Sequence, residues 1–259
     1  MRQHIDAGAA FSERVRVLFN SRAEAWSRKY GPEGKLVWRL AEFAEPLGQL
    51  VRPPASVLDF GCGTGDLAMH LWIHGYRVTG CDIAELMLTA ARRNFGDAMV
   101  DWVTLNAGCK HLPFPDERFD AVVASSVLEY VADVEQVLAE LSRVLREGGV
   151  LLFNIPDPAN RRRRREQWLE QATRPAWVRG TVGIIPRVRR LRRYLELSKN
   201  RFLLSEWQWR AALAGLHSVD VRGKTESRPL ALLAFRKVAP WTRPPRQQRL
   251  ALREAADAD

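Results

Sequence analysis

A glycine-rich turn constrains the fold of this chain more than any other segment. Residues 57–65 read Val-Leu-Asp-Phe-Gly-Cys-Gly-Thr-Gly, so an apolar run suited to a buried strand is followed by glycine at alternate positions. Glycine adopts left-handed backbone angles and leaves room for a ligand against bare main chain. Residues 66–72 read as a helix whose first N–H groups face the same space. The segment therefore predicts a nucleotide-binding turn in an α/β fold.

The spacing of the glycines separates the classes of nucleotide. Dinucleotide-binding folds use Gly-x-Gly-x-x-Gly, whose third glycine lets the helix pack closely while its N-terminus receives a pyrophosphate. Here the pattern is Gly61-x-Gly63-x-Gly65, and no Lys-Ser/Thr pair follows as in a phosphate-binding loop. Asp82 ends the next predicted strand and is placed to bind two ribose hydroxyls. A nicotinamide-dependent oxidoreductase is an alternative that this spacing disfavours.

Four blocks of sequence, in this order, resemble the class I S-adenosylmethionine (AdoMet)-dependent methyltransferases of small molecules. The glycine turn is the first block, and Leu-Pro-Phe-Pro-Asp-Glu-Arg-Phe-Asp at 112–120 is the second. The others are Ser-Ser-Val-Leu-Glu-Tyr-Val-Ala-Asp at 125–133 and the helix-like stretch with two final glycines at 137–149. The resemblance covers residues 19–155 well and 205–238 more loosely. It implies AdoMet as the cofactor and methyl transfer as the reaction.

The resemblance also assigns cofactor contacts. Asp59 would organise the methionine end, Asp82 would hold the ribose and Ile83 would pack against adenine, whereas strand-end capping is the alternative role for the two aspartates. Many relatives have Asp-Ala at the position of Gly108-Cys109, so backbone groups or Asn106 would replace that adenine contact. The full expected cofactor-binding set is Trp26, Asp59, Gly61, Cys62, Gly63, Gly65, Asp82, Ile83, Cys109 and Ser125.

The sequence leaves the catalytic base open. Methyl transfer from a sulfonium is an in-line displacement, in which the protein chiefly aligns the acceptor and excludes water. A base is needed only where the acceptor does not lose its proton readily. The candidates are Glu129, Tyr130, which stands where many relatives have histidine, and His111, together with groups in residues 156–204. A loop histidine without a catalytic role is the alternative for His111. We expect no metal.

The alternation of strand and helix patterns predicts the fold class α/β: a doubly wound, mostly parallel seven-stranded sheet with a C-terminal antiparallel hairpin. Ser205 and Gln208 have the spacing of a capping box at the start of the last helix, and Gly215 follows its end. Strands are expected near 56–60, 77–82, 100–105, 119–124, 149–155, 217–223 and 230–237, and helices near 65–74, 84–93, 134–146 and 205–214.

We expect five regions along the chain. They are an N-terminal helical cap over 1–50, an AdoMet-binding core over 51–155, a basic helical insertion over 156–204 that forms an acceptor lid, a C-terminal helix and hairpin over 205–239, and a mobile tail over 240–259. In the cap, Trp26 stands where the family closes an aromatic side chain over the cofactor. A helical stripe of Phe19, Ala23 and Trp26 that simply packs on the sheet is the alternative.

All of the surplus positive charge lies in residues 156–204. This segment has 14 Lys and Arg against 4 Asp and Glu, a balance of +10 that equals the net charge of the whole chain. Ile184, Val188, Leu191 and Leu195 recur at helical spacing with arginines between them. Residues 184–195 therefore predict a basic amphipathic helix suited to an anionic membrane surface or a polyanionic acceptor. A core-packing helix with a solvated basic face is the alternative.

Composition and missing motifs narrow the location and the acceptor. The three cysteines form no metal-type C-x-x-C motif, no apolar run reaches 18 residues and no secretory leader is recognised, so we expect a cytoplasmic protein, with membrane association through 184–195 as an option. The Asn/Asp-Pro-Pro-aromatic motif of many nucleic-acid methyltransferases is missing after the fourth strand. We expect a small-molecule, lipid or glycan acceptor methylated at oxygen. An RNA methyltransferase, or a non-catalytic AdoMet-binding protein that contacts a membrane or polyanion, is the alternative.

Overall fold

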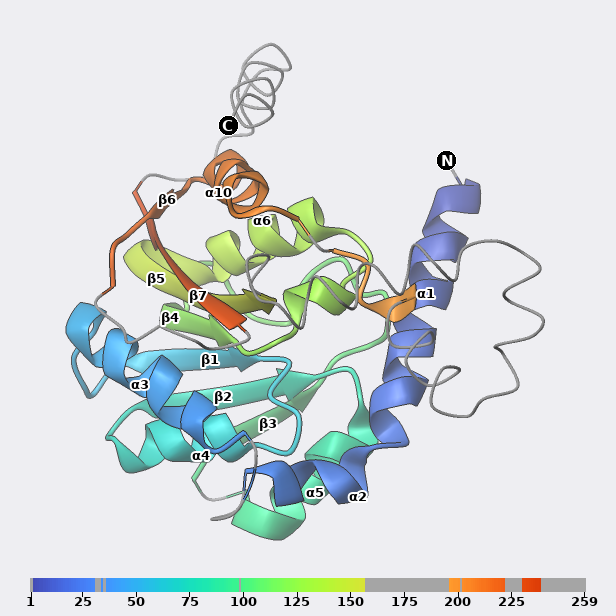
Figure 1. Cartoon of the computed structure of the whole chain (residues 1–259), viewed down its shortest axis with the longest axis horizontal. Helices are drawn as coiled ribbons and strands as arrows, with labels where there is room; N and C mark the ends of the chain where they lie inside the picture. The colour runs from blue at the N-terminus through green and yellow to red at the C-terminus, as the bar shows by residue number, and fades with distance from the viewer. Residues whose placement is uncertain are drawn as a thin grey trace.

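A seven-stranded sheet with the order β3-β2-β1-β4-β5-β7-β6 forms the centre of the structure (Figure 1). Strands β1 to β5 are parallel to one another, whereas β7 pairs antiparallel with both β5 and β6. The predicted α/β class, with its antiparallel ending, is confirmed. The strands are β1 (Ser56–Phe60), β2 (Arg77–Asp82), β3 (Asp101–Thr104), β4 (Phe119–Ala124), β5 (Leu145–Pro156), β6 (Leu216–Ser218) and β7 (Leu230–Lys237).

The computed structural model describes residues 2–30, 34, 36–97, 99–156, 196–200, 202–221 and 230–238. The expected basic helix at 184–195 and the tail at 240–259 lie outside these residues. None of the helices in the described part of the chain is long and apolar enough to cross a membrane. The helices are α1 (Arg2–Asn20), α2 (Ala23–Trp26), α3 (Trp38–Leu50), α4 (Asp66–Ile73), α5 (Glu85–Phe95), α6 (Val134–Val144) and α10 (Leu204–Leu213), with 3-10 turns η1 (Ser27–Lys29) and η2 (Leu128–Tyr130).

Helices cover both faces of the sheet, so both faces are apolar. Successive side chains of a strand point to opposite faces. Leu58 of β1 therefore joins one core cluster, with Leu138 of α6 and Trp207 of α10, while its neighbour Val57 joins the other, with Leu47 of α3. All five of these side chains are fully buried. Burial on both sides explains the nearly continuous apolar run of β1.

The order of the strands fixes where a ligand can bind. The chain runs from β1 outward to β2 and β3 and then returns to β4 on the other side of β1. In open α/β sheets a crevice forms at such a reversal, outside the carboxyl ends of the strands. These ends of β1 and β2 point toward α1 and α2 (Figure 1). The N-terminal helices therefore lie over the predicted binding edge.

The largest differences from the expected element boundaries lie at the junction of α6 with β5 and in β6. Helix α6 ends at Val144, two residues early, because Leu145 is fully buried and pairs with Phe119 as the first residue of β5. Strand β6 ends at Ser218, where a strand over 217–223 was expected. The local apolar pattern did not reveal that Leu145 already belongs to the sheet.

The start of the last helix also differs from the expected capping box. Helix α10 begins at Leu204, one residue early, and Leu203 is its N-cap. The carboxylate of Glu206 accepts a hydrogen bond of 2.8 Å from the backbone N–H of Leu203. Glu206 is therefore the residue whose side chain binds the N-cap backbone. The expected capping box of Ser205 and Gln208 was wrong, because the N-cap and its partner lie two residues earlier, at Leu203 and Glu206.

Candidate active site

The loop after β1 requires glycine for its backbone angles and for close packing. Gly61 and Gly65 have φ angles of +71° and +81°, in the left-handed region that other residues rarely adopt. A Cβ atom on Gly61 would lie 2.5 Å from Cγ2 of Val127, and one on Gly65 would lie 2.5 Å from Cη2 of Trp102. The N–H of Gly61 donates 2.8 Å to the carbonyl of Cys81 in β2. The glycine loop is thus fitted tightly against its neighbours.

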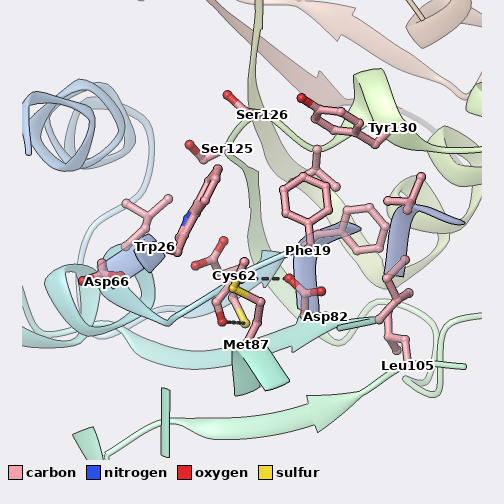
Figure 2. A pocket seen from close by; sticks show the side chains of 18 of the residues that line it. Phe19, Trp26, Cys62, Asp66, Asp82, Met87, Leu105, Ser125, Ser126 and Tyr130 are labelled. Atoms are coloured by element: carbon pink, nitrogen blue, oxygen red, sulfur yellow. Dashed lines mark hydrogen bonds between the residues drawn. The ribbon is translucent and has the colours of Figure 1, made fainter. Parts of the chain in front are cut away.

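Asp82, at the end of β2, fixes the glycine loop from the other side. Its Oδ2 accepts a hydrogen bond of 2.9 Å from the N–H of Gly63 (Figure 2), and its Oδ1 accepts one of 2.8 Å from the N–H of Ala84. Burial raises the pKa of this carboxyl, and the backbone N–H groups oppose that rise. Each oxygen keeps a second lone pair. Asp82 can therefore hold the loop and still accept hydrogen bonds from a ligand.

Asp59, at the end of β1, is a buried carboxyl with an unused oxygen. It is 1% exposed, and its Oδ2 has no hydrogen-bond partner among the described residues. Burial, followed by the charge of Asp82, raises its pKa to about 8. The buried hydroxyl of Ser125 after β4 also lacks a partner there. Such orphaned groups are costly unless a ligand satisfies them, and a cation would suit the carboxylate best.

These groups line one pocket of about 860 Å³ that α1 and α2 cover. The ring of Phe19 lies edge-on to Trp26 and to Tyr130, with centroid distances of 5.7 and 5.1 Å. Trp26, Ser125 and Asp82 surround the same space (Figure 2). The apolar wall is completed by residues that the sequence patterns did not single out: Val15, Met87 and Leu105.

Trp26 lies over the glycine loop and carries a cation on its ring. Its Nε1 lies 3.6 Å from the position that a Cβ of Gly63 would take. The Nζ atom of Lys29 is 3.5 Å from the ring centroid. Burial, followed by the charges of Arg22 and Arg39, lowers the pKa of Lys29 to about 8. Trp26 therefore stands between the glycine loop and a cationic rim.

A second pocket, of about 1400 Å³, adjoins the first. Ile83 and Tyr130 line both pockets. Cys109, which the resemblance placed near the adenine, is exposed and lines only the second pocket, together with Asn106. The cofactor-binding set is therefore divided: Cys109 lies apart from the others, and Gly65 lines neither pocket because it packs against Trp102 at the start of α4.

The three candidate bases are not brought together. Tyr130 lies at the junction of the two pockets. Glu129 is buried but lines neither pocket, and its Oε2 accepts a hydrogen bond of 2.6 Å from Ser198. The side chain of His111 is 79% exposed, and its Nδ1 lies 3.2 Å from Glu140. His111 also lines neither pocket, so of the three only Tyr130 faces the pocket space.

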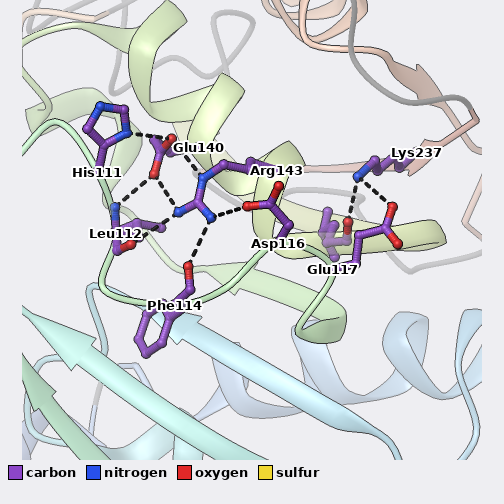
Figure 3. A network of polar contacts seen from close by, with 9 residues as sticks. His111, Leu112, Phe114, Asp116, Glu117, Glu140, Arg143 and Lys237 are labelled. Carbon is purple, nitrogen blue, oxygen red and sulfur yellow. Dashed lines mark hydrogen bonds and ion pairs between the residues drawn. The ribbon is translucent and has the colours of Figure 1, made fainter.

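Helix α6 fixes the Leu-Pro-Phe-Pro loop that precedes β4 (Figure 3). The carboxylate of Glu140 accepts a hydrogen bond of 2.8 Å from the N–H of Leu112. Arg143 donates hydrogen bonds of 2.9 Å to the carbonyl of Phe114 and of 2.7 Å to the carboxylate of Asp116. Burial raises the pKa of Glu140, but hydrogen bonds, chiefly from Arg143, outweigh it and leave the pKa below its ordinary value. Glu140 thus stays ionised and shapes one wall of the second pocket.

The residues that follow 156–195 return to the same site. The side-chain amide of Asn200 donates to the carbonyls of Leu128 and Val131 at 2.9 and 2.8 Å, on either side of Tyr130. Leu197 is buried in one cluster with Tyr130. Nothing in the polar sequence around Asn200 signalled this contact. The end of the expected insertion therefore holds the turn that carries Tyr130.

Comparisons with known proteins agree with this geometry. A family model described as a methyltransferase domain matches residues 58–153. The demethylmenaquinone methyltransferase of Thermus thermophilus is 40% identical over 112 residues, which are 42% of this chain and 51% of that protein. The malonyl-acyl-carrier-protein O-methyltransferase of Yersinia pestis is 36% identical over 98 residues, 38% of this chain and 35% of that protein. The chain thus spans about half, or less, of the length of these relatives.

A solved structure shows the same fold over a longer stretch. The SAM-dependent methyltransferase from Thermotoga maritima superposes with a TM-score of 0.57 at 19% sequence identity, covering 85% of this chain and 97% of that one. The family match contains the glycine loop, Asp82 and the Tyr130 turn. Residues 58–153 therefore resemble a methyltransferase domain, and the chain has the same fold as the solved AdoMet-dependent methyltransferase.

Proposed function

We propose that this chain binds AdoMet in the pocket between the glycine loop and α1 and transfers its methyl group to an apolar acceptor. The observation that carries the proposal is the pair of carboxyl groups at the ends of β1 and β2. Asp59 presents a buried oxygen without a partner among the described residues, and Asp82 presents two oxygens that are already oriented by backbone N–H groups. A ligand with a cationic end and a vicinal diol satisfies both.

The remaining lining groups fit the same ligand. The carboxylate of Asp59 would accept hydrogen bonds from the ammonium group of the methionine end, and Asp82 would accept them from the ribose hydroxyls. Ile83 and Leu105 supply apolar surface for the adenine, and Trp26 would cover the glycine loop. When bound there, AdoMet supplies an electrophilic methyl group on a sulfonium.

The protein's own contribution is alignment and exclusion of water. We assign to Tyr130 the orientation of the acceptor, because it lies where the two pockets meet and its ring is held by Phe19. The phenolic hydroxyl of Tyr130 can both donate and accept a hydrogen bond, so we give it a hydrogen-bonding role. We propose no role in methyl transfer for Glu129 or His111, since neither lines the pocket space.

The walls of the cofactor pocket favour an apolar acceptor. Val15, Phe19 and Met87 line the pocket, whose acidic residues are confined to the ends of β1 and β2 and the start of α4: Asp59, Asp82 and Asp66. Of the two relatives, one is named for demethylmenaquinone and the other as an O-methyltransferase of a malonyl carrier protein. Of the acceptors expected from the sequence, these walls favour a small molecule or a lipid over a glycan, and we propose methylation at oxygen. Contact of residues 184–195 with an anionic membrane is part of this proposal and lies outside the described residues.

Transfer of labelled methyl groups tests the proposal directly. The full chain is incubated with methyl-labelled AdoMet and a panel of apolar compounds that carry a phenolic, enolic or carboxylic oxygen, and label is counted in the organic phase. We expect transfer to at least one compound and its loss in Asp82→Ala. If calorimetry shows that AdoMet binds but no compound and no cell extract accepts label, the chain is a non-catalytic binding protein. If AdoMet does not bind, the site assignment fails.

A further inference from the structure

A row of arginines lies along the end of the sheet where the parallel strands begin, opposite the cofactor pocket. In the sheet order β2-β1-β4-β5-β7, each of the five neighbouring strands contributes one arginine at this end. The parallel strands contribute theirs at or before their amino ends, and the antiparallel β7 contributes its own near its carboxyl end. The row, in the order of the strands, is Arg77, Arg52, Arg118, Arg146 and Arg236.

These arginines surround one open cleft of about 1100 Å³. All five line it, and the only acidic side chains in the lining are Glu117 and Asp120. Neighbouring strands lie roughly 4.8 Å apart, so the strand ends beside which the arginines lie are close together. The cleft shares no lining residue with the cofactor pocket or with the pocket that adjoins it. It is therefore a separate site.

The two carboxylates of the cleft are already engaged. Asp120 accepts hydrogen bonds of 2.6 and 2.8 Å from the N–H and the hydroxyl of Ser56, and its other oxygen lies 2.5 Å from Arg146. Burial raises the pKa of Asp120, but the bonds from Ser56 and the charges of Arg146 and Arg77 outweigh it and leave the pKa below its ordinary value. Glu117 lies 3.7 Å from the buried Nζ of Lys237.

Three cations of the row are left without such partners. Arg146 pairs with Asp120, and Arg236 donates 2.7 Å to a backbone carbonyl. Arg52, Arg77 and Arg118 are exposed and make no hydrogen bond or ion pair with another described residue through their guanidinium groups. They come from the adjacent strands β1, β2 and β4. Like charges held this close repel one another, and an anion placed between them removes that repulsion.

We propose that this cleft binds a ligand with two or more linked phosphate groups, such as a diphosphate. The guanidinium group is planar and binds phosphate oxygens through paired hydrogen bonds. The backbones of three neighbouring strands extend over about 10 Å, so guanidinium groups carried at their ends can contact two linked phosphates. AdoMet carries no phosphate and a positive sulfonium, so the cofactor itself does not match this site.

Calorimetric titration of the full chain with inorganic pyrophosphate tests the proposal. We expect saturable binding that weakens as salt rises from 50 to 200 mM, and weaker binding of inorganic phosphate. The variant Arg77→Gln/Arg118→Gln should weaken pyrophosphate binding at least tenfold, because it removes two of the three cations and breaks only the contact of Arg118 with the ring of Phe119, 5.8 Å from its centroid, among the described residues. The control Arg14→Gln/Arg93→Gln removes two exposed positive charges elsewhere and should leave the affinity within about twofold.

Several results would overturn the assignment. One is that pyrophosphate does not bind the unaltered chain. Another is that both double variants lose affinity equally, since net charge alone would then account for binding. A third is that the cleft variant binds as the unaltered chain does, which would move the site to the arginines of residues 156–204. Loss of binding to anionic phosphatidylglycerol vesicles by the cleft variant, without pyrophosphate binding, would show a membrane contact instead. Thermal unfolding confirms that each variant is folded.

Discussion

The backbone N–H of Gly63 donates a hydrogen bond of 2.9 Å to Oδ2 of Asp82, and this bond joins the loop after β1 to the end of β2. The other oxygen of Asp82 accepts from Ala84 and so fixes the start of the chain toward α5. One carboxylate thus orders the two backbone segments that face the cofactor pocket. Its geometry is preset before a ligand arrives, which lowers the entropic cost of binding.

Replacing Asp82 should weaken AdoMet binding strongly. Asp82→Ala removes the proposed ribose contacts and releases the glycine loop, and we expect the dissociation constant measured by calorimetry to rise at least tenfold, or about 1.4 kcal/mol. Asp97→Ala, in an exposed residue that pairs with Arg92, is the matched control. An affinity for AdoMet that is the same in Asp82→Ala and in the control would remove Asp82 from the cofactor site.

The buried carboxyl of Asp59 predicts opposite effects on stability and on binding. Its pKa is about 8 in the fold against an ordinary value of 3.8, so between these pH values the folded chain without cofactor holds a proton that the unfolded chain has lost. This contribution to stability is complete below about pH 4 and is lost as pH rises through 8. Asp59→Asn cannot ionise, so it should lack this dependence.

The measurement is unfolding by denaturant, without cofactor, at several pH values. We expect the free energy of unfolding of Asp59→Asn to rise relative to that of the unaltered chain between pH 5 and pH 8.5. The same variant should bind AdoMet at least tenfold more weakly, because a neutral amide replaces the carboxylate that faces the ammonium group. Asp97→Asn serves as the control. A stability difference that is constant with pH would show that Asp59 is ionised in the empty site.

The strand pattern and the glycine turn were enough to predict the sheet because both are local. Val57 and Leu58 lie in an apolar run that only a doubly covered strand accommodates, and the glycine spacing fixed the turn beside it. The same local signals placed Asp59 and Asp82 at adjacent strand ends, where the structure has them. Positions set by backbone periodicity were therefore predictable.

Positions set by long-range packing were not predictable from the sequence patterns. The sequence around His111 predicts only a loop, yet the ring of His111 contacts Glu140 on α6, 29 residues away in sequence. Val15 reaches the pocket only because α1 lies across the carboxyl ends of the strands. Asn200 lies 72 residues beyond Leu128 in sequence, and no pattern around either residue predicts their hydrogen bond. Such contacts depend on the direction of whole helices and connections.

Gly65 offers a test that separates close packing from backbone strain. Gly65→Ala adds a Cβ 2.5 Å from Trp102 at a φ of +81°, whereas Gly148→Ala adds one at a φ of +73° with no atom within 4 Å. The control should cost about 1 kcal/mol of unfolding free energy from the left-handed angle alone. Gly65→Ala should cost about 1 to 3 kcal/mol more, because the indole must move. If urea denaturation shows the same loss of unfolding free energy in both variants, the indole of Trp102 moves aside without an energetic cost.

Asn200 provides a test of the contact between the end of the expected insertion and the Tyr130 turn. Asn200→Asp keeps the shape of the side chain but replaces the amide that donates to the carbonyls of Leu128 and Val131 with a carboxylate that repels them. Since Asn200 is buried, we expect a loss of about 1 to 3 kcal/mol in unfolding free energy. Asn94→Asp, in an exposed residue whose amide donates to Ser27, is the control and should cost less than about 0.5 kcal/mol.

The same Asn200 variant should also change the site, because the two carbonyls flank Tyr130. If the turn is held from Asn200, its release should raise the dissociation constant of AdoMet several-fold at a temperature where the variant is fully folded, and Asn94→Asp should leave that constant unchanged. Asn200→Asp that loses stability but binds AdoMet as tightly as the unaltered chain would show that the contact braces the fold without positioning Tyr130.

Tyr130→Phe keeps the ring against Phe19 and removes only the hydroxyl, so it should retain AdoMet affinity while methyl transfer slows.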